Sequence, residues 1–403
     1  MDDALLQQKC VAYLYKLCME IPERCVGSEG NRKATRFFEE EISTFGWKTE
    51  AQEFDAVDWE QGGAGITCRD ENFEVLVSPY SLGCEVEGTL ISASSVTELE
   101  NLKLKDRILL LHGDIAREQL MPKNFVFFNP QEHQHIISLL EKGEPLAIIS
   151  ATGRNSSLAG GVYPFPLIED GDFNIPSVYM KDVDGLRLLP RTGETVSLRS
   201  VSKRIMGKGE NIIARKGKGQ GKRILVTAHI DAKKGTPGAI DNATGVIVLL
   251  LLARLMEDYK GDRLIEIVAL NGEDYYAVPG QMRYLNENRD RLHEILFNIN
   301  IDGAGYREGR SAFSFYDFPV ELKQKAVEVM QKFDGILEGP QWYQGDHSIF
   351  IQNGCPAIAV SSEWFTSNMD SQDVTHTPKD QPGIVDCQKV VEIAEALNLL
   401  LRI

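Results

Sequence analysis

The stretch Arg223-Ile-Leu-Val-Thr-Ala-His-Ile-Asp231 decides the fold class of this chain. Its apolar and β-branched residues are typical of a buried strand, and the polar His229 and Asp231 follow where that strand should end. Two later apolar runs end in the same way, at Glu273-Asp274 and at Asp302. Acidic and imidazole side chains therefore follow three successive strands, and open α/β sheets place their ligand sites at the carboxyl ends of such strands.

The neighbouring segments complete an α/β alternation. Strands are predicted near 210–215, 223–229, 263–270, 295–301 and 357–361, and helices near 244–259, 280–292, 320–333, 346–352 and 386–401. Strands that alternate with helices form a mostly parallel sheet. The sequence therefore predicts a mixed, mostly parallel sheet sandwiched by helices.

Five side chains in this part of the chain are candidate metal ligands: His229, Asp241, Asp274, Asp302 and His376. Taken singly, each has a structural interpretation, since an Asp before a helix is more often an N-cap than a ligand. Together, imidazole nitrogens and carboxylate oxygens suit zinc, with cobalt or manganese as tolerable substitutes. Five ligands are too many for one tetrahedral zinc ion with an open position. They suit two zinc ions if one carboxylate bridges them, and we expect Asp241 to be that bridge.

Several short motifs occur in one order along the chain: His229-x-Asp231, Asp241-Asn242-Ala-Thr-Gly, Asn271-Gly-Glu273-Asp274, Asn300-Ile-Asp302, Gly345-Asp-His347 and His376-Thr-x-x-Asp380. In this order they resemble the co-catalytic zinc exopeptidases related to aminopeptidase Y and glutamate carboxypeptidase II. The resemblance runs from about residue 205 to the C-terminus. Nearer the start, Arg24-Cys-Val-Gly-Ser-Glu-Gly-Asn resembles that family's Arg-x-x-Gly-Ser-x-Gly-Asn motif.

The resemblance implies how the metals are held. One zinc ion would be bound by His229, Asp241 and Asp302. The other would be bound by Asp241, Asp274 and His376, which gives two zinc ions per chain. Relatives have a cis peptide after the bridging aspartate, so we expect one after Asp241.

The resemblance also implies two catalytic roles. Asp231 would hydrogen-bond His229 and fix its tautomer without binding metal. Glu273 would be the general base, taking a proton from the water held by the metals and handing it to the leaving amine.

The chain departs from the family's commoner pattern at two places. Many members have Glu-Glu where Glu273-Asp274 stands, and the shorter carboxylate can still bind zinc. Many also have Tyr before the last His, where its hydroxyl helps to stabilise the oxyanion, and Thr375 stands there. Tyr343 or the backbone could supply that donor instead. The candidate substrate-binding residues are Tyr343, His347, Trp364 and Phe365.

These motifs favour a di-zinc aminopeptidase that hydrolyses the N-terminal residue of peptides through a hydroxide bridging the metals. One alternative is a carboxypeptidase acting on dipeptide-like substrates, for which Arg307 and Arg310 could bind the terminal carboxylate. A second is a glutaminyl-cyclase-like transferase with one zinc ion, although retention of His229 and Asp302 argues against it. A third is an inactive binding module, although every ligand position and the base are retained.

Residues 56–204 have a different pattern, with short β-rich runs divided by Gly, Asn and Pro turns. They resemble the protease-associated domain often inserted in these exopeptidases. We therefore expect a catalytic domain of residues 1–55 and 205–403, and an inserted protease-associated-like domain over 56–204.

The pair His133-x-His135 precedes a helical pattern, in which such residues face different directions and do not share a metal.

The composition agrees with a cytoplasmic enzyme, and the resemblance implies a peptide substrate as its partner. A net charge of −16 argues against nucleic acid and anionic membranes as partners. Seven scattered cysteines without a Cys-x-x-Cys pair favour reduced thiols over a disulfide framework. The start, Met1-Asp-Asp-Ala, lacks the basic beginning of a signal peptide, and the alternative is a secreted protein whose signal is absent from this sequence. The oligomeric state stays open.

Overall fold

A computed structural model describes residues 3–154 and 160–402 of the chain. The chain forms two compact units, one of Met1–Ala56 with Lys208–Ile403 and the other of Val57–Gly207. Two long strands, β1 (Lys48–Cys68) and β7 (Thr195–Lys216), contribute residues to both units. The boundaries predicted at residues 55 and 205 lie close to these divisions.

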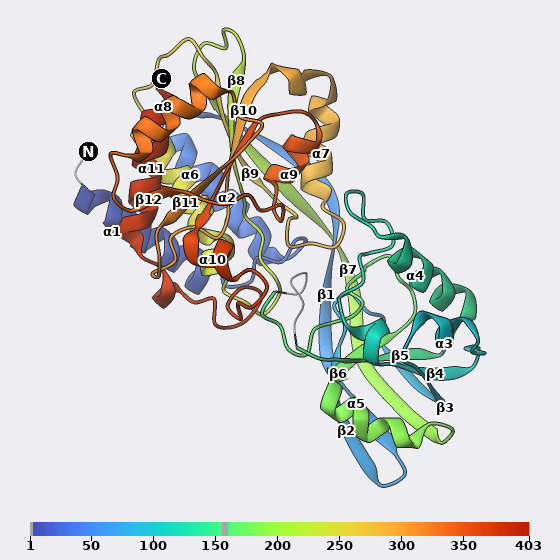
Figure 1. The fold of residues 1–403 in the computed structure, drawn as a ribbon. Coiled ribbons are helices and arrows are strands. Elements are labelled where there is room, and N and C mark those ends of the chain that lie inside the picture. Colours follow the sequence, from blue (N-terminus) through green and yellow to red (C-terminus); the bar gives the residue numbers. More distant parts are fainter. Residues whose placement is uncertain (1–2, 155–159, 403) are drawn as a thin grey trace. The chain divides into compact units, whose positions relative to one another are not determined.

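The first unit is built on a mixed sheet in the order β7-β9-β8-β10-β13-β11-β12 (Figure 1). Its four central strands, β9, β8, β10 and β13, are parallel to one another. The strands β7 and β11 pair antiparallel with β9 and β13, and β12 pairs parallel with β11. The strands are β8 (Arg223–His229), β9 (Ile265–Leu270), β10 (Ile295–Ile301), β11 (Ser311–Tyr316), β12 (Ile336–Glu338) and β13 (Ala357–Ser362). This arrangement confirms the predicted mixed, mostly parallel sheet. The strands β11 and β12 were not predicted from the sequence.

Helices cover both faces of this sheet (Figure 1). Because α6 (Thr244–Leu255) is apolar on every side, it is buried between the sheet and an outer layer of helices. That layer consists of α1 (Asp3–Tyr15), α2 (Glu29–Thr44), α8 (Val320–Met330) and α11 (Cys387–Leu401). The other face carries α7 (Pro279–Asn288) and α9 (His347–Gln352), and α10 (Glu363–Asn368) follows β13.

The second unit has its own hydrophobic core and a sheet in the order β1-β2-β6-β5-β4-β3-β7. Its further elements are β2 (Glu71–Val77), β3 (Cys84–Ala93), α3 (Val96–Glu100), β4 (Arg107–Leu111), α4 (Gln131–Gly143), β5 (Ala147–Thr152), β6 (Ser177–Lys181) and α5 (Asp182–Leu188). His133 and His135 lie on α4 and have different partners, the backbone N–H of Met121 and the carboxylate of Glu100. They do not form a metal-binding pair. The resemblance to a protease-associated domain stays a prediction.

The register of the parallel strands determines where the ligand-bearing loops begin. His229 at the end of β8 is opposite Leu270 at the end of β9, and Thr227 of β8 is opposite Asn300 near the end of β10. The three strands therefore end at one edge of the sheet, and the loops that follow them start side by side.

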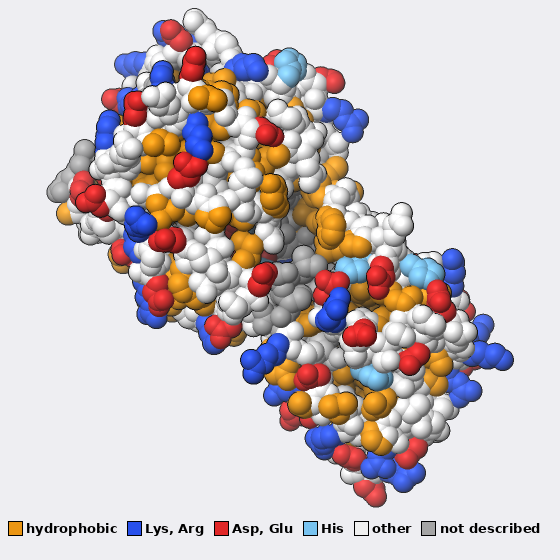
Figure 2. All heavy atoms as spheres, viewed as in Figure 1, with side chains coloured by type: hydrophobic (Ala, Val, Ile, Leu, Met, Phe, Trp, Pro, Cys, Tyr) orange, Lys and Arg blue, Asp and Glu red, His pale blue; other side chains and the backbone are white. Residues whose placement is uncertain are grey.

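The surface offers no single charged patch on the face that Figure 2 shows. Acidic and basic side chains are interspersed there, although the chain as a whole has a net charge of −16. Within residues 3–154 and 160–402, no helix combines the length and apolar character needed to cross a membrane.

Candidate metal centre

The five predicted ligand side chains are neighbours in space, in two groups that share Asp241. His229 Nε2 lies 3.2 Å from Asp241 Oδ1 and 3.5 Å from Asp302 Oδ1. On the other side, His376 Nε2 lies 3.2 Å from Asp241 Oδ2 and 3.0 Å from Asp274 Oδ1. Each oxygen of the Asp241 carboxylate thus faces a different imidazole.

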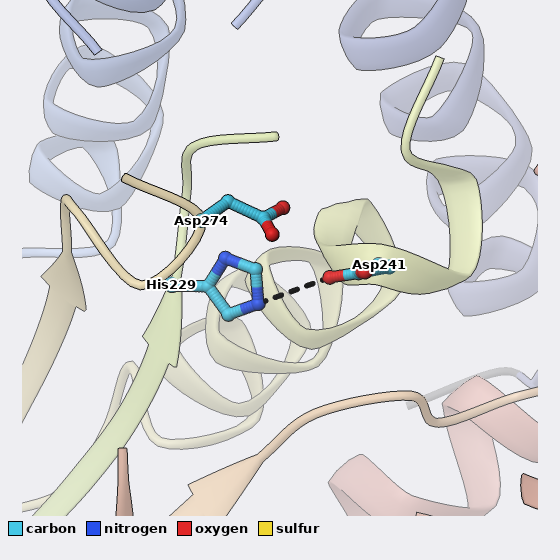
Figure 3. A group of neighbouring side chains, drawn as sticks. All are labelled: His229, Asp241 and Asp274. Atoms are coloured by element: carbon cyan, nitrogen blue, oxygen red, sulfur yellow. Dashed lines mark ion pairs between the residues drawn. The ribbon is translucent and has the colours of Figure 1, made fainter. Parts of the chain in front are cut away.

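These distances fit ligands that share a metal ion. Two donors bound tetrahedrally to one zinc ion at about 2.0–2.2 Å lie roughly 3.3–3.5 Å apart. Figure 3 shows the imidazole of His229 next to the carboxylates of Asp241 and Asp274, and one donor atom from each residue lies within 4.8 Å of the others. His229 Nε2 and Asp274 Oδ2 are buried without a hydrogen-bond partner, although buried polar atoms are nearly always satisfied. The donor set therefore fits a divalent cation.

The segment between β8 and α6 presents Asp241 through a local backbone irregularity. The peptide bond between Asp241 and Asn242 is cis, which confirms the expectation from the resemblance. The side chain of Asn242 donates to Ile301 O at 2.8 Å and accepts from Gly245 N at 3.0 Å. A Cβ atom at Gly245 would lie 2.4 Å from Asn242 Oδ1 and 2.7 Å from Ile301 O. Gly245 therefore lets the start of α6 approach the end of β10.

Asp231 joins two parts of the centre. Its carboxylate accepts hydrogen bonds from Gly272 N at 2.7 Å and from Asp274 N at 3.0 Å. His229 Nδ1 lies 3.2 Å from the main-chain oxygen of Asp231 and 3.6 Å from its carboxylate. The backbone carbonyl is thus the nearer partner of the imidazole, and the carboxylate mainly fixes the loop that carries Asp274.

Asp380 has the same function for the loop that carries Asp241. Its fully buried carboxylate accepts from Ile240 N at 2.7 Å and from Asp241 N at 3.0 Å. Burial and the nearby charge of Asp241 raise the pKa of Asp380 to about 7, against the effect of these hydrogen bonds. This role of Asp380 was not predicted from the sequence, although its place four residues after His376 in the last motif was a usable signal.

Arg24 connects the N-terminal motif to the metal centre. Its buried guanidinium donates to four carbonyl oxygens: Leu17 O at 2.7 Å, Ile230 O at 3.1 Å, Pro237 O at 2.8 Å and Gly238 O at 2.8 Å. Three of these acceptors belong to the segment between His229 and Asp241. Asn31, from the same motif, donates to Arg24 O and to Asn271 Oδ1 at the end of β9. The motif therefore holds the backbone between two ligands.

The electrostatic environment shifts the ionisation of the central groups. Burial raises the pKa of Glu273 well above its usual range; His229 opposes this shift, and the charges of Asp302 and Asp274 add to it. Burial disfavours the charged form of His229 and His376, but the surrounding carboxylates outweigh it and hold both pKa values well above the usual range. A carboxyl group with a raised pKa can exchange protons near neutral pH.

The four predicted substrate-binding residues have unequal access to solvent. The side chain of Tyr343 is exposed, and its hydroxyl donates to Gln341 Oε1 at 3.2 Å. His347 is fully buried, its Nε2 donates to Trp342 O at 2.8 Å, and burial lowers its pKa to about 4. His347 is therefore neutral at pH 7 and packs beneath the surface in this structure.

Trp364 and Phe365 form an aromatic cluster with Tyr306. The ring centroids of Trp364 and Phe365 lie 4.8 Å and 5.2 Å from that of Tyr306. A Cβ atom at Gly303, the residue after Asp302, would lie 3.9 Å from the ring of Phe365. The cluster thus lies next to a predicted ligand.

Thr375, which takes the place of the family's tyrosine, is engaged locally. Its hydroxyl accepts from Gln372 Nε2 at 2.6 Å, and its backbone N–H donates to Gln372 Oε1 at 3.0 Å. Gln372 therefore orders the turn before His376, whose backbone adopts a positive φ of 61°.

A comparison with known proteins finds a family profile that spans this centre. Residues 211–400, a little under half of the chain, match the sequence profile described as Peptidase family M28. The predicted relationship to zinc exopeptidases is thereby confirmed.

Relatives of this M28 region include aminopeptidase YwaD from Bacillus subtilis, which is 26% identical over 229 residues, or 53% of this chain and 48% of that protein. The chain thus spans about half the length of that curated relative.

Two solved structures share the fold over nearly the whole chain. The aminopeptidase from Aneurinibacillus sp. strain AM-1 has a TM-score of 0.73 at 20% identity, covering 99% of this chain and 95% of that one. The zinc aminopeptidase BSAP from Bacillus subtilis has a TM-score of 0.72 at 17% identity, covering 98% and 94%.

We predict that Asp380→Asn weakens zinc binding at the metal centre by about 10- to 100-fold. This is the typical effect of changing a residue whose hydrogen bonds orient a metal ligand. The amide keeps the volume of the carboxyl group but turns an NH₂ toward one of the two N–H groups that position Asp241. A chelator-competition titration measures the affinity. Asp373→Asn, which changes an exposed carboxylate of the same segment, is the matched control and should bind zinc normally. Normal affinity in folded Asp380→Asn protein would contradict this role.

Proposed function

We propose that the protein is a zinc-dependent aminopeptidase with two zinc ions per chain. The observation that carries the proposal is the sharing of Asp241, whose two carboxylate oxygens each lie 3.2 Å from a different histidine. A carboxylate shared in this way is suited to bridge two metal ions, because each ion then has three protein ligands and room for water and substrate.

Under this proposal, His229, Asp241 and Asp302 would hold one zinc ion, and Asp241, Asp274 and His376 would hold the other. When bound, the zinc ions supply Lewis acidity and bring the pKa of a water molecule close to neutrality. Cobalt or manganese would tolerate the same nitrogen and oxygen donors.

The protein's own residues manage the proton and the geometry. Glu273, whose pKa is raised by burial, accepts a proton from the attacking water and delivers it to the amine that leaves the peptide. Asp231 holds the backbone of Gly272 and Asp274 on either side of Glu273, so that the base and the adjacent ligand keep a fixed separation. Asp274 faces His376, which leaves Glu273 free for proton transfer.

The charge around the centre favours the amino end of a peptide. Carboxylates outnumber imidazoles there, and such a surplus attracts a free α-amine. The two arginines that a carboxypeptidase would need have exposed side chains: Arg307 is 58% exposed and Arg310 is 53% exposed, and each has an acidic partner within 4 Å, Glu308 and Glu363. Their position on the surface supports aminopeptidase action over carboxypeptidase action.

The aromatic cluster suggests which first residue is preferred. Tyr306, Trp364 and Phe365 pack with Ile240 and Val374 in one apolar group. Ile240 precedes Asp241, and Val374 lies two residues before His376, so this group is attached to the loops that bear the ligands. An apolar or aromatic first side chain would find a matching surface beside the centre.

The first prediction from this proposal concerns metal stoichiometry. Native protein should contain about two zinc ions per chain by elemental analysis, because five ligands with one bridge make two open tetrahedral sites. Asp241→Asn should weaken both sites together, whereas His376→Ala should mainly empty one. A single site at saturating zinc would exclude the two-metal arrangement.

The second prediction concerns the base. Glu273→Gln should keep both metals and the fold but lower turnover by at least ~10²-fold, since it removes proton transfer while preserving the shape of the side chain. Steady-state kinetics with parallel zinc analysis measures this effect. Glu308 is exposed and lies shortly after Asp302 in the sequence, so Glu308→Gln is a matched control and should leave turnover unchanged. Near-normal turnover in Glu273→Gln would refute the assignment of the base.

The third prediction concerns the end of the peptide that is cut. Aminoacyl chromophores with a free amine and an apolar or aromatic residue should be hydrolysed, and N-acetylation should abolish their cleavage because it removes the positive charge. Panels of free and N-acetylated dipeptides provide the measurement. Faster cleavage of the acetylated panel, with a raised KM in Arg307→Ala or Arg310→Ala, would instead identify a carboxypeptidase.

A further inference from the structure

Two cysteines far apart in the sequence meet where the first helix of the chain packs on the last. The helices α1 and α11 pack against each other, and Gln7 Nε2 donates to Gln388 Oε1. One turn further along α1, Cys10 lies in the hydrophobic core against which Cys387, the neighbour of Gln388, also packs, and the two thiols interact. Both cysteines are free.

The two thiols differ in ways that favour reaction at one of them. Cys10 is fully buried, whereas Cys387 is partly exposed at the first residue of the 15-residue helix α11. Backbone N–H groups and the helix dipole at that position favour a thiolate. The hydrogen bond with Cys10 lowers the pKa of Cys387, against burial and the charge of Asp386. The same bond, together with burial, raises the pKa of Cys10.

Cys18, Cys355 and Cys84 lack these features. Burial raises the pKa values of Cys18 and Cys355 to about 11, so both stay protonated at neutral pH. Cys84, which is also partly exposed, has its pKa raised by burial and pairs with the hydroxyl of Ser200. Cys84 is therefore a suitable control for exposure alone.

We propose that Cys10 and Cys387 are an oxidation site at which a peroxide forms a disulfide between α1 and α11. The Cys387 thiolate attacks one peroxide oxygen, the O–O bond breaks, and the departing oxygen takes a proton and leaves as water or an alcohol. The sulfenic acid on Cys387 is then attacked by the sulfur of Cys10, the S–O bond breaks, and water leaves with the thiol proton. Two thiols are oxidised by two electrons, and one peroxide is reduced.

The position of the cross-link gives it a structural consequence. It would join residues near the two ends of the chain, and closing so long a loop restricts the unfolded state. It would also fix the start of α11, where Asp386 N donates to Gly305 O at 2.9 Å and Lys389 Nζ donates to Tyr306 O at 3.0 Å. These acceptors lie shortly after Asp302, so the cross-link would steady the support of that loop. The proposal does not depend on the enzyme's activity.

The test treats the full-length protein with hydrogen peroxide and analyses it by mass spectrometry without reduction. We expect a mass loss of about 2 Da, recovered on adding dithiothreitol, and a peptide pair linked through Cys10 and Cys387. The oxidised protein should also have a melting temperature several degrees higher than the reduced protein. Cys84→Ser should behave as the parent, whereas Cys387→Ser should show neither the mass loss nor the shift.

The order of the two steps is tested with Cys10→Ala, which leaves the sulfenic acid without its partner. Dimedone should then label Cys387 after peroxide treatment, and no label should appear there in the parent once the disulfide has formed. Three results would overturn the proposal: retention of all thiols, sulfinic acid at Cys387 of the parent without a linked peptide, or a disulfide that uses a different cysteine or a second chain.

Discussion

The rest of the structure depends on the crowding of carboxylates around two imidazoles at one edge of a parallel sheet. His229 and His376 both face Asp241, and Asp274 and Asp302 complete the two groups at distances of 3.0–3.5 Å. Buried like charges so close together are unfavourable unless cations or strong hydrogen bonds compensate them. The proposed zinc ions would supply that compensation at the centre, and backbone N–H groups supply it around the centre.

Two buried aspartates that bind no metal in the proposal make the arrangement rigid. Asp231 accepts from the backbone beside Glu273, and Asp380 accepts from the backbone N–H groups of Ile240 and Asp241. Each of them uses its carboxyl oxygens to hold a loop rather than a metal. Arg24 complements them from the N-terminal segment by donating to the carbonyl groups between β8 and α6. Loops that would otherwise be mobile are thereby fixed on the scaffold of the sheet.

The N-terminal and C-terminal segments of the chain are structurally linked to the centre. Arg24 and Asn31 connect the segment between α1 and α2 to the ends of β8 and β9, and the start of α11 supports the backbone after Asp302. Cys10 of α1, the helix before the Arg24 segment, packs in the same core as Cys387 at the start of α11. A covalent bond there would join these two helices without touching a ligand.

The sequence by itself determined the parallel core, because strands buried on both faces, such as β8 and β9, have near-continuous apolar runs, interrupted in β9 by the buried Glu266. It also indicated the candidate ligands His229, Asp274 and Asp302, since polar side chains at the ends of such runs are visible without coordinates. Asp241 and His376 were indicated by the order of the motifs. Only the tertiary structure decided the short strand β12 and its neighbour β11, whose buried serines lack a clear apolar alternation. Likewise, the role of Asp380 and the pairing of Cys10 with Cys387 depend on contacts across 139 and 377 positions of the chain. Local sequence patterns record which residues are buried, but only the packed chain shows which distant residues meet.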